Sequence, residues 1–357
     1  MPWLRLLRVP NLLTVPGDVL SGFFLAVVSL RACGVDVSVS QFVPALALCL
    51  CASLCLYAAG LVFNDVADLA VDAVERPSRP LPSGAIGRRA ASMAGVCFVL
   101  AGLAAARFAG ECSLDAEGAR SAPALFAGTP AELPLSPALL AAAALAVVAC
   151  VYDIPVVRRR FAFPAVALMG VCRGLDVLLG AALLVPLAAG RGLDPVQAFG
   201  TPAAGALAVA AYVAAFSICA RGEASAPGPA PSRKMYLPAV ALVLTLLPAV
   251  VMALLAQQDP AESFSAGGLP VRTVQVARLL PVFALAIALL HALVLARFYA
   301  RHVPVPEVAG RFIGNLPRVQ AALVLCAWSC DAALVSGFVL FFLPVPFLRL
   351  AGRFPSS

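Results

Sequence analysis

Residues 43–63 read VPALALCLCASLCLYAAGLVF, and residues 64–72 continue directly with NDVADLAVD. The first stretch contains no charged residue and is long enough to cross about 30 Å of hydrocarbon as a helix. The second stretch places three carboxylates at the end of that apolar run. The sequence therefore predicts a membrane-spanning helix that ends in a cluster of acids.

Apolar segments of similar length recur along the whole chain. The 357 residues are 62% apolar and 12% charged, with a mean hydropathy of +0.98, which excludes a soluble globular domain and a disordered chain. Nine helices are predicted to cross the membrane, at residues 12–30, 43–63, 91–109, 136–153, 164–187, 202–220, 236–256, 277–298 and 319–345. We therefore expect an all-α integral membrane protein with a single membrane domain over residues 1–357.

The basic residues indicate how the chain is oriented. The net charge of +7 could suggest a nucleic-acid partner, but the arginines separate apolar segments and do not cluster on one element, so no nucleic acid is expected. With the N-terminus inside, about twice as many basic residues fall in the inner segments as in the outer ones. We expect a multi-pass protein of the cell inner membrane whose N-terminus is cytoplasmic. Nine crossings then place the C-terminus on the opposite side.

A short repeat suggests two related halves. The letters DVLSG at residues 18–22 recur as DVLLG at residues 176–180. Both stretches fall in predicted helices that start on the inner side, which favours a parallel repeat of four plus four helices. Four matched letters among apolar residues could also arise by chance.

The acids after the second predicted helix are spaced for one helical face. Asp65, Asp68 and Asp72 are three and four residues apart and share a face if the helix continues. Carboxylates in that arrangement repel one another unless a cation lies among them, and a hard divalent ion such as Mg²⁺ can bridge carboxylates to phosphate oxygens. The acids could equally form a solvated helix end at the membrane surface.

Two arginines follow the acids in a loop stiffened by proline, ERPSRPLPSG at residues 75–84. Arg76 and Arg79 can hold phosphate oxygens through paired hydrogen bonds. Acids for a metal beside arginines for an anion favour a diphosphate site. Both arginines could instead be ordinary anchors on the inner side.

These motifs together resemble the UbiA family of intramembrane prenyltransferases. The run NDxxDxxxD at residues 64–72 followed by RPxRPxPSG at 76–84 resembles the family's first aspartate-rich motif. RVPN at residues 8–11 and YDIP at 152–155, which leads to Arg158, also fit the family pattern. The resemblance extends over nearly the whole chain, and the family's nine helices agree with the count above.

The resemblance implies a fold, a reaction and a set of site residues. It implies a UbiA-like bundle in which Mg²⁺ draws diphosphate away from an allylic isoprenoid, so that an unidentified acceptor in the membrane captures the prenyl group. The inner loops 64–90 and 221–235 would form a cap over the active site. The catalytic and metal-binding residues would be Asp65, Asp68 and Asp72, with Asn11, Asn64, Arg76, Arg79, Tyr152 and Arg158 binding substrate.

The chain departs from the family pattern after the sixth predicted helix. A second aspartate-rich motif is expected there, but residues 217–225 read SICARGEAS. Glu223 alone remains as a further metal ligand, and Arg221 could replace a second metal by contacting phosphate. The departure leaves room for a second function, a non-catalytic isoprenoid or lipid carrier on a UbiA-like scaffold.

The fifth predicted helix carries an unusual pair of charges. The run MGVCRGLDVLLG at residues 169–180, with the later RGE at 221–223, resembles the EboC-like branch of the superfamily. That resemblance implies that Arg173 and Asp176 face the central cavity and bind acceptor or phosphate. The alternative is a buried pair within one helix that neutralises itself.

Overall fold

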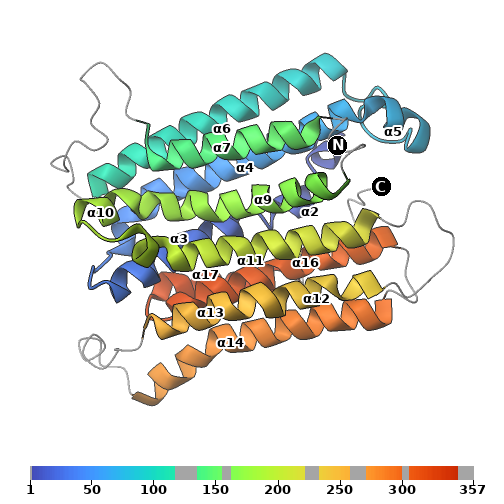
Figure 1. Cartoon of the computed structure of the whole chain (residues 1–357). Coiled ribbons are helices and arrows are strands. Elements are labelled where there is room, and N and C mark those ends of the chain that lie inside the picture. Colours follow the sequence, from blue (N-terminus) through green and yellow to red (C-terminus); the bar gives the residue numbers. More distant parts are fainter. Residues whose placement is uncertain are drawn as a thin grey trace.

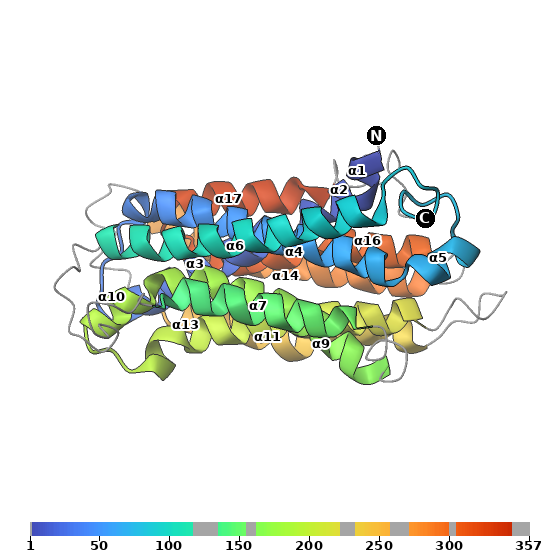
Figure 2. The ribbon, with the colours of Figure 1, turned by 90° about the horizontal axis from the view of Figure 1, so that it is seen from above.

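The computed structural model describes residues 2–116, 135–154, 162–221, 233–257, 271–299 and 305–344. Within these ranges the chain forms helices and has no strand. The long helices lie side by side along one common direction, as two views at right angles show (Figure 1, Figure 2). The predicted all-α fold class is confirmed.

Two short helices precede the long helices of the first half. The bounds are α1 (Pro2–Leu6), α2 (Val9–Leu12), α3 (Pro16–Ala32), the 3₁₀ turn η1 (Val39–Phe42), α4 (Val43–Ala67), α5 (Leu69–Glu75), α6 (Arg88–Ala116) and α7 (Pro137–Asp153). Pro16, Pro44 and Pro137 lie in the first turns of their helices, where a missing backbone N–H breaks no hydrogen bond. The N-terminus and α5 lie at one end of the bundle (Figure 1). This end is called the cap end below.

The second half contains more interruptions. The bounds are α9 (Ala162–Ala181), η2 (Ala182–Leu184), α10 (Val185–Gly190), α11 (Pro195–Arg221), η3 (Arg233–Tyr236), α12 (Leu237–Ala241), the π turn η4 (Leu242–Leu246), α13 (Leu247–Leu255), α14 (Val271–Val294), the π turn η5 (Leu295–Tyr299), α16 (Val305–Val324), η6 (Leu325–Ala327) and α17 (Asp331–Phe342). Helix α10 lies at the end opposite to α5 (Figure 1).

Helix lengths and exposed side chains indicate that the outer surface of the bundle contacts membrane lipid. Seven helical stretches of the described chain are long and apolar enough to cross a membrane, and α7 and α17 are shorter apolar helices. Large apolar side chains such as Leu100, Phe283 and Val339 are exposed on the outer faces of α6, α14 and α17, where water would not tolerate them in such number. The protein is an integral membrane protein, while the count of nine spans stays a prediction.

The last predicted span is wrong as a single helix. Residues 319–345 are divided between α16 and α17 by η6 and a turn, and Arg311 and Arg318, expected in a loop, lie on α16. Helix α16 carries these charges along one side, which lowers its mean hydropathy below that of a membrane span and explains why it was missed. The predicted placement of the C-terminus depended on that count of crossings, so it stays a prediction.

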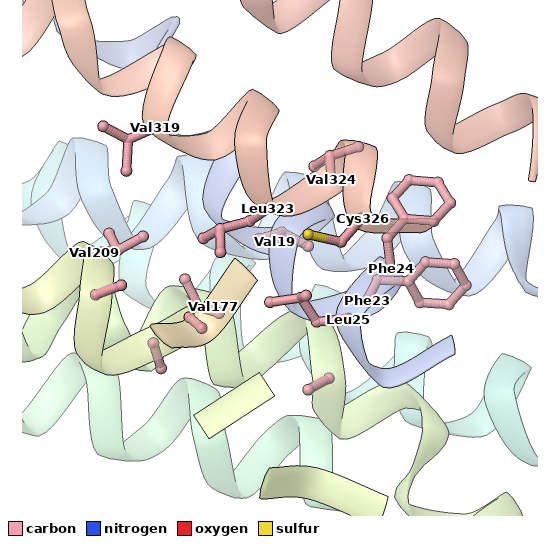
Figure 3. Close-up of a cluster of buried hydrophobic side chains, with 14 of the residues drawn as sticks. Val19, Phe23, Phe24, Leu25, Val177, Val209, Val319, Leu323, Val324 and Cys326 are labelled. Carbon is pink, nitrogen blue, oxygen red and sulfur yellow. The ribbon is translucent and has the colours of Figure 1, made fainter. Parts of the chain in front are cut away.

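Helix α3 forms the centre of the bundle. Val19, Phe23 and Leu25 of α3 are completely buried. Figure 3 shows them beside Val177 of α9 and Leu323 of α16. A helix that is apolar on all sides is expected to be surrounded by other helices, and this position lets α3 connect the two halves of the chain.

Helices α3 and α9 approach each other through glycine. A Cβ atom on Gly22 would overlap the carbonyl oxygen of Val177, and a Cβ atom on Gly180 would overlap the carbonyl oxygen of Val19. Small residues at such a crossing allow two backbones to approach closely in a membrane. The contact is reciprocal, because the fifth residue of each DVL(S/L)G stretch touches the second residue of the other. The four-plus-four repeat itself stays a prediction, but its two matched stretches do meet.

Candidate active site

The acidic run at the cap end is broken where a continuous helix was expected. Helix α4 ends at Ala67, and Asp68 has φ −89° and ψ 0° between α4 and α5. Asp65 and Asp72 are nevertheless both buried, with exposed fractions of 5% and 3%, whereas Asp68 is half-buried. The break therefore directs two of the three carboxylates inward.

Arginines surround the two buried carboxylates. An Nη2 atom of Arg8 donates to Oδ1 of Asp65 at 2.6 Å. Nη1 of Arg79 lies 2.6 Å from Oδ2 of Asp72 and 3.9 Å from Oδ1 of Asp65, so one nitrogen is shared by both acids. Arg76 lies farther out, with its Nη1 at 4.0 Å from Oδ1 of Asp72. We call Arg8, Asp65, Asp72, Arg76 and Arg79 the cap cluster.

Local structure holds the cap cluster in place. The backbone of Arg8 has φ 45°, a left-handed conformation that side chains other than glycine adopt rarely and that is often found at functional sites. The loop after Arg79 is closed by a hydrogen bond from the Ile86 amide to the Pro80 carbonyl at 3.0 Å. Leu81 and Ile86 then pack in a small apolar cluster with Leu6 and Val62. This packing fixes the loop that carries Arg79 against α1 and α4.

The cap cluster offers oxygen donors of the kind that Mg²⁺ prefers. Two buried carboxylates converge on one guanidinium nitrogen, so a cation at that place would meet both Asp65 and Asp72. Across the described ranges, no three His, Cys, Asp or Glu side chains are grouped closely enough to hold a metal. Two carboxylates still suit Mg²⁺, which is commonly bound by one or two carboxylates together with substrate phosphates and water. In this structure Arg8 and Arg79 supply the positive charges that balance Asp65 and Asp72.

A cavity of about 260 Å³ lies next to the cap cluster, within the bundle. Its wall is mainly apolar, from residues such as Leu56, Leu145 and Phe216. Several predicted substrate-binding residues from different helices come together on this wall, together with Arg8 of the cap cluster. They are Asn11, Asn64, Tyr152, Arg173 and Asp176.

A polar network borders the cavity at the level of Arg173. Nε of Arg173 lies 2.7 Å from Oδ2 of Asp18, and an Nη2 atom donates to the Thr14 carbonyl at 2.8 Å. Gln320 of α16 donates to both Oδ1 of Asp18 at 2.6 Å and the Thr14 carbonyl at 2.7 Å. The Arg173 guanidinium also lies over the ring of Tyr57, 5.6 Å from its centroid. We call this set, with Ser53 and Asp176, the inner network.

The inner network shows which side chains Arg173 and Asp176 contact, whereas their binding of acceptor or phosphate stays a prediction. Ser53 of α4 donates to Oδ1 of Asp176 at 2.6 Å, and Arg173 pairs with Asp18 of α3. Each charge therefore contacts a different helix, and both residues border the cavity. The self-neutralising pair within one helix is not what the structure contains.

Comparison with known proteins found similarity over short stretches of the sequence and over the fold. No family model matches the chain. Two curated proteins named digeranylgeranylglyceryl phosphate synthase are similar over short stretches: that of Methanoregula boonei is 49% identical over 51 residues, and that of Pyrococcus abyssi is 42% identical over 77 residues. These stretches span 14% and 21% of this chain but only 18% and 28% of the relatives.

A solved structure extends the similarity to the whole bundle. A digeranylgeranylglyceryl phosphate synthase structure superposes with a TM-score of 0.50 over 92% of this chain and 98% of its own, at 17% identity. The chain resembles the UbiA prenyltransferases. A UbiA homolog from Archaeoglobus fulgidus bound to DMAPP and Mg²⁺ is also similar, with a TM-score of 0.45, 16% identity and coverage of 90% and 99%. The predicted resemblance to the UbiA family is confirmed.

Some predicted site residues of this UbiA-like chain cannot be placed. Arg158 and Glu223 lie outside the described residues, and Arg221 is described only as the last backbone position of α11. The proposed second metal ligand and the second part of the predicted cap, 221–235, therefore stay predictions. The predicted metal ligands and arginines of the motif lie at the cap end, and none of them lines the cavity: Asp65, Asp68, Asp72, Arg76 and Arg79.

Sequence reasoning missed several residues of the UbiA-like site. Arg8 was quoted only as part of a motif, yet it contacts Asp65. Asp153, at the end of α7, is buried on the cavity wall. Thr14 and Gln320 belong to the inner network. An acid at the end of an apolar helix is a signal that could have identified Asp153, but no local pattern identifies Gln320.

Proposed function

We propose that this protein transfers a prenyl group from an isoprenoid diphosphate to an acceptor inside the membrane. The observation that carries the proposal is the placement of the cap cluster beside a mainly apolar cavity within the bundle. One end of the site provides charge for a diphosphate, and the other provides an apolar chamber for its tail. The similarity to UbiA prenyltransferases supports the same reading.

The residues of the cap cluster would bind the diphosphate. Arg8, Arg76 and Arg79 offer planar guanidinium groups that suit phosphate oxygens. Asn11 and Asn64 line the adjacent wall and can donate hydrogen bonds to substrate oxygens. The acids and arginines already pair with each other. A diphosphate could therefore take the place of a carboxylate as the acceptor of the guanidinium hydrogen bonds.

Asp65 and Asp72, with Asp68 beside them, would hold Mg²⁺. When bound, the metal neutralises charge that builds on the leaving diphosphate. The chain's own contribution is to keep water away from the reacting carbon through the apolar wall formed by residues such as Leu61 and Val213. The aromatic faces of Tyr57 and Phe216 on the same wall can stabilise a developing cation.

We place the cap end at the cytoplasmic face of the cell inner membrane, because the basic residues favour that side. The acceptor would enter the same cavity from the membrane or from the cap end. Its identity is not specified by the cap cluster.

The test is release of diphosphate from allylic isoprenoid diphosphates by the purified protein in detergent, with and without Mg²⁺. We expect release that requires Mg²⁺ and falls by roughly 10²-fold or more in Asp65→Asn and Asp72→Asn, because each removes a carboxylate that would hold the Mg²⁺ acting on the leaving group. Asp36→Asn is the matched control, since Asp36 is exposed and lies in the loop after α3, away from the cap end. Equal release by all four proteins would contradict the assigned site.

One observation favours a second function, the isoprenoid or lipid carrier. Arg8 and Arg79 already balance the charges of Asp65 and Asp72, and Arg76 adds a further positive charge, so the cap could bind an anionic lipid without a metal. The same experiment separates the two functions. A protein that binds isoprenoid diphosphate but releases no diphosphate from any donor, even with cell extract supplying acceptors, is a carrier.

A further inference from the structure

The depth of the cavity can be read from the helices that line it. On α4 the lining residues run from Leu56 to Asn64, and on α7 from Leu145 to Asp153. Both are separations of eight residues, which correspond to about 12 Å along a helix. Helix α9 lines the cavity from Met169 to Asp176, about 10 Å by the same rise. Three helices therefore give the same depth.

The cavity has a mouth at the cap end and a floor inside the bundle. Asn64 is adjacent to Asp65 of the cap cluster, so its level marks the mouth. Leu56, Leu145 and Asp176 are the lining residues farthest from the cap end on their helices. All three are almost completely buried. A tail attached to a diphosphate at the mouth would extend toward this floor.

Polar contacts reinforce the floor. Asp176 is held by Ser53 of α4, and the neighbouring Arg173 is held by Asp18 and Thr14. Gln320 ties Asp18 and Thr14 to α16. A tail that went deeper beside α9 would have to separate buried charged groups from their partners, which is strongly unfavourable in a membrane.

We infer that this protein prefers donors with two isoprene units, geranyl diphosphate among the common series. The inference rests on the proposed function and names its donor class. An isoprene unit contributes four carbon–carbon bonds, or about 5 Å when extended, so two units match a 12 Å chamber and four exceed it. The volume of about 260 Å³ is also below the roughly 300–1,000 Å³ of ordinary ligand pockets.

The first measurement compares dimethylallyl, geranyl, farnesyl and geranylgeranyl diphosphates as donors for the full-length protein in detergent. Diphosphate release is followed at each donor concentration to give kcat/KM. We expect geranyl diphosphate to exceed geranylgeranyl diphosphate by at least about tenfold, the size of discrimination that a closed pocket gives for extra carbon. Equal or better use of the longest donor would overturn the inference, because the tail would then leave between the helices.

The second measurement changes the floor. Leu56→Ala combined with Leu145→Ala removes two floor side chains, so we expect the preferred donor to become farnesyl diphosphate. Leu140→Ala is the matched control, because Leu140 is exposed on the same helix α7 as Leu145 and does not line the cavity. It is expected to leave the order of donors unchanged. A floor variant that still uses geranyl diphosphate but gains nothing with farnesyl diphosphate counts against the floor.

The two proposals fail in different ways. No diphosphate release from any of the four donors contradicts the prenyl-transfer function itself. Release with a preference for long donors leaves that function intact and contradicts only the length limit. If the floor variants do not fold, the donor series with the unmodified protein still decides.

Discussion

Arg79 lies between two acids, at a position where a metal ion could contact both of them. Its Nη1 atom is 2.6 Å from Asp72 and 3.9 Å from Asp65, and with Arg8 on Asp65 the charges of both acids are balanced before any ligand arrives. The sequence alone presented Asp65 and Asp72 as metal ligands and Arg79 as a phosphate ligand. The contacts connect the two predicted roles, since an anion bound at Arg79 would free carboxylate oxygens beside it.

The pair formed by Arg173 and Asp18 gives a prediction about stability. Asp18 is completely buried, and Arg173→Met would leave its carboxylate without a cation, a change that costs roughly 3–5 kcal/mol. We expect a clear drop in the midpoint of thermal unfolding in detergent. Arg107→Met is the control, because Arg107 and Glu111 form a partly exposed pair of the kind worth about 0–1 kcal/mol. Equal midpoints for the two variants would show that the buried pair does not stabilise the bundle.

The sequence predicted those helices whose residues are apolar along their whole length. It missed helices in which charged residues interrupt the apolar ones. The apolar stretch at residues 43–63 became α4 because its composition permits little else in a membrane. The acids after it obeyed helical spacing only up to Asp68, where the chain turns into α5. Helix α16 carries Arg311, Arg318 and Gln320, so no hydropathy window could find it.

The site was predictable in part for the same reason. Asn64, Asp65 and Asp72 lie close together in the sequence, so their spacing indicated a shared site. The contact between Arg173 and Asp18 joins residues far apart in the chain, and it depends on how α3 packs against α9. Only the repeated DVL stretch hinted that these two helices were related.

The close crossing of α3 and α9 gives a prediction at the scale of the element. Gly22→Ala would place a methyl group against the Val177 carbonyl, so the helices must separate and lose contact. We expect lower thermal stability and weaker donor binding, because the inner network spans the same two helices. The control is Gly200→Ala in α11, where a Cβ atom meets nothing within 4 Å. That variant should be unchanged or slightly more stable, since alanine favours a helix by about 1 kcal/mol over glycine.

Charge is distributed unevenly over the whole molecule. Arginines of the cap end, such as Arg5, Arg76 and Arg89, lie near the acidic motif, whereas the loop after α3 at the other end carries Asp36. This asymmetry is the basis for placing the cap end in the cytoplasm. It also places the arginines that we propose to bind phosphate on the side where a water-soluble diphosphate would be met first.

Fusion to alkaline phosphatase, which is active only outside the cytoplasm, tests the orientation. We expect a fusion after Gly34, in the loop after α3, to be active, and a fusion after Gly84, in the cap loop, to be inactive. The two joints are separated by α4 alone among the long helices, so a single crossing is tested. The reverse pattern would place the cap end outside the cytoplasm.

The reciprocal contact between Gly22 and Gly180 has a consequence for how the sequence can diverge. The backbone of each helix leaves no room for a side chain at the glycine of the other helix. A larger residue at either position would therefore push the two helices apart and remove the close contact that restricts both positions to small residues. In descendants that retain the crossing, both positions are expected to stay small. In descendants that lose it, the restriction on the remaining glycine disappears. The two positions should therefore evolve as a linked pair, although they are far apart in the gene.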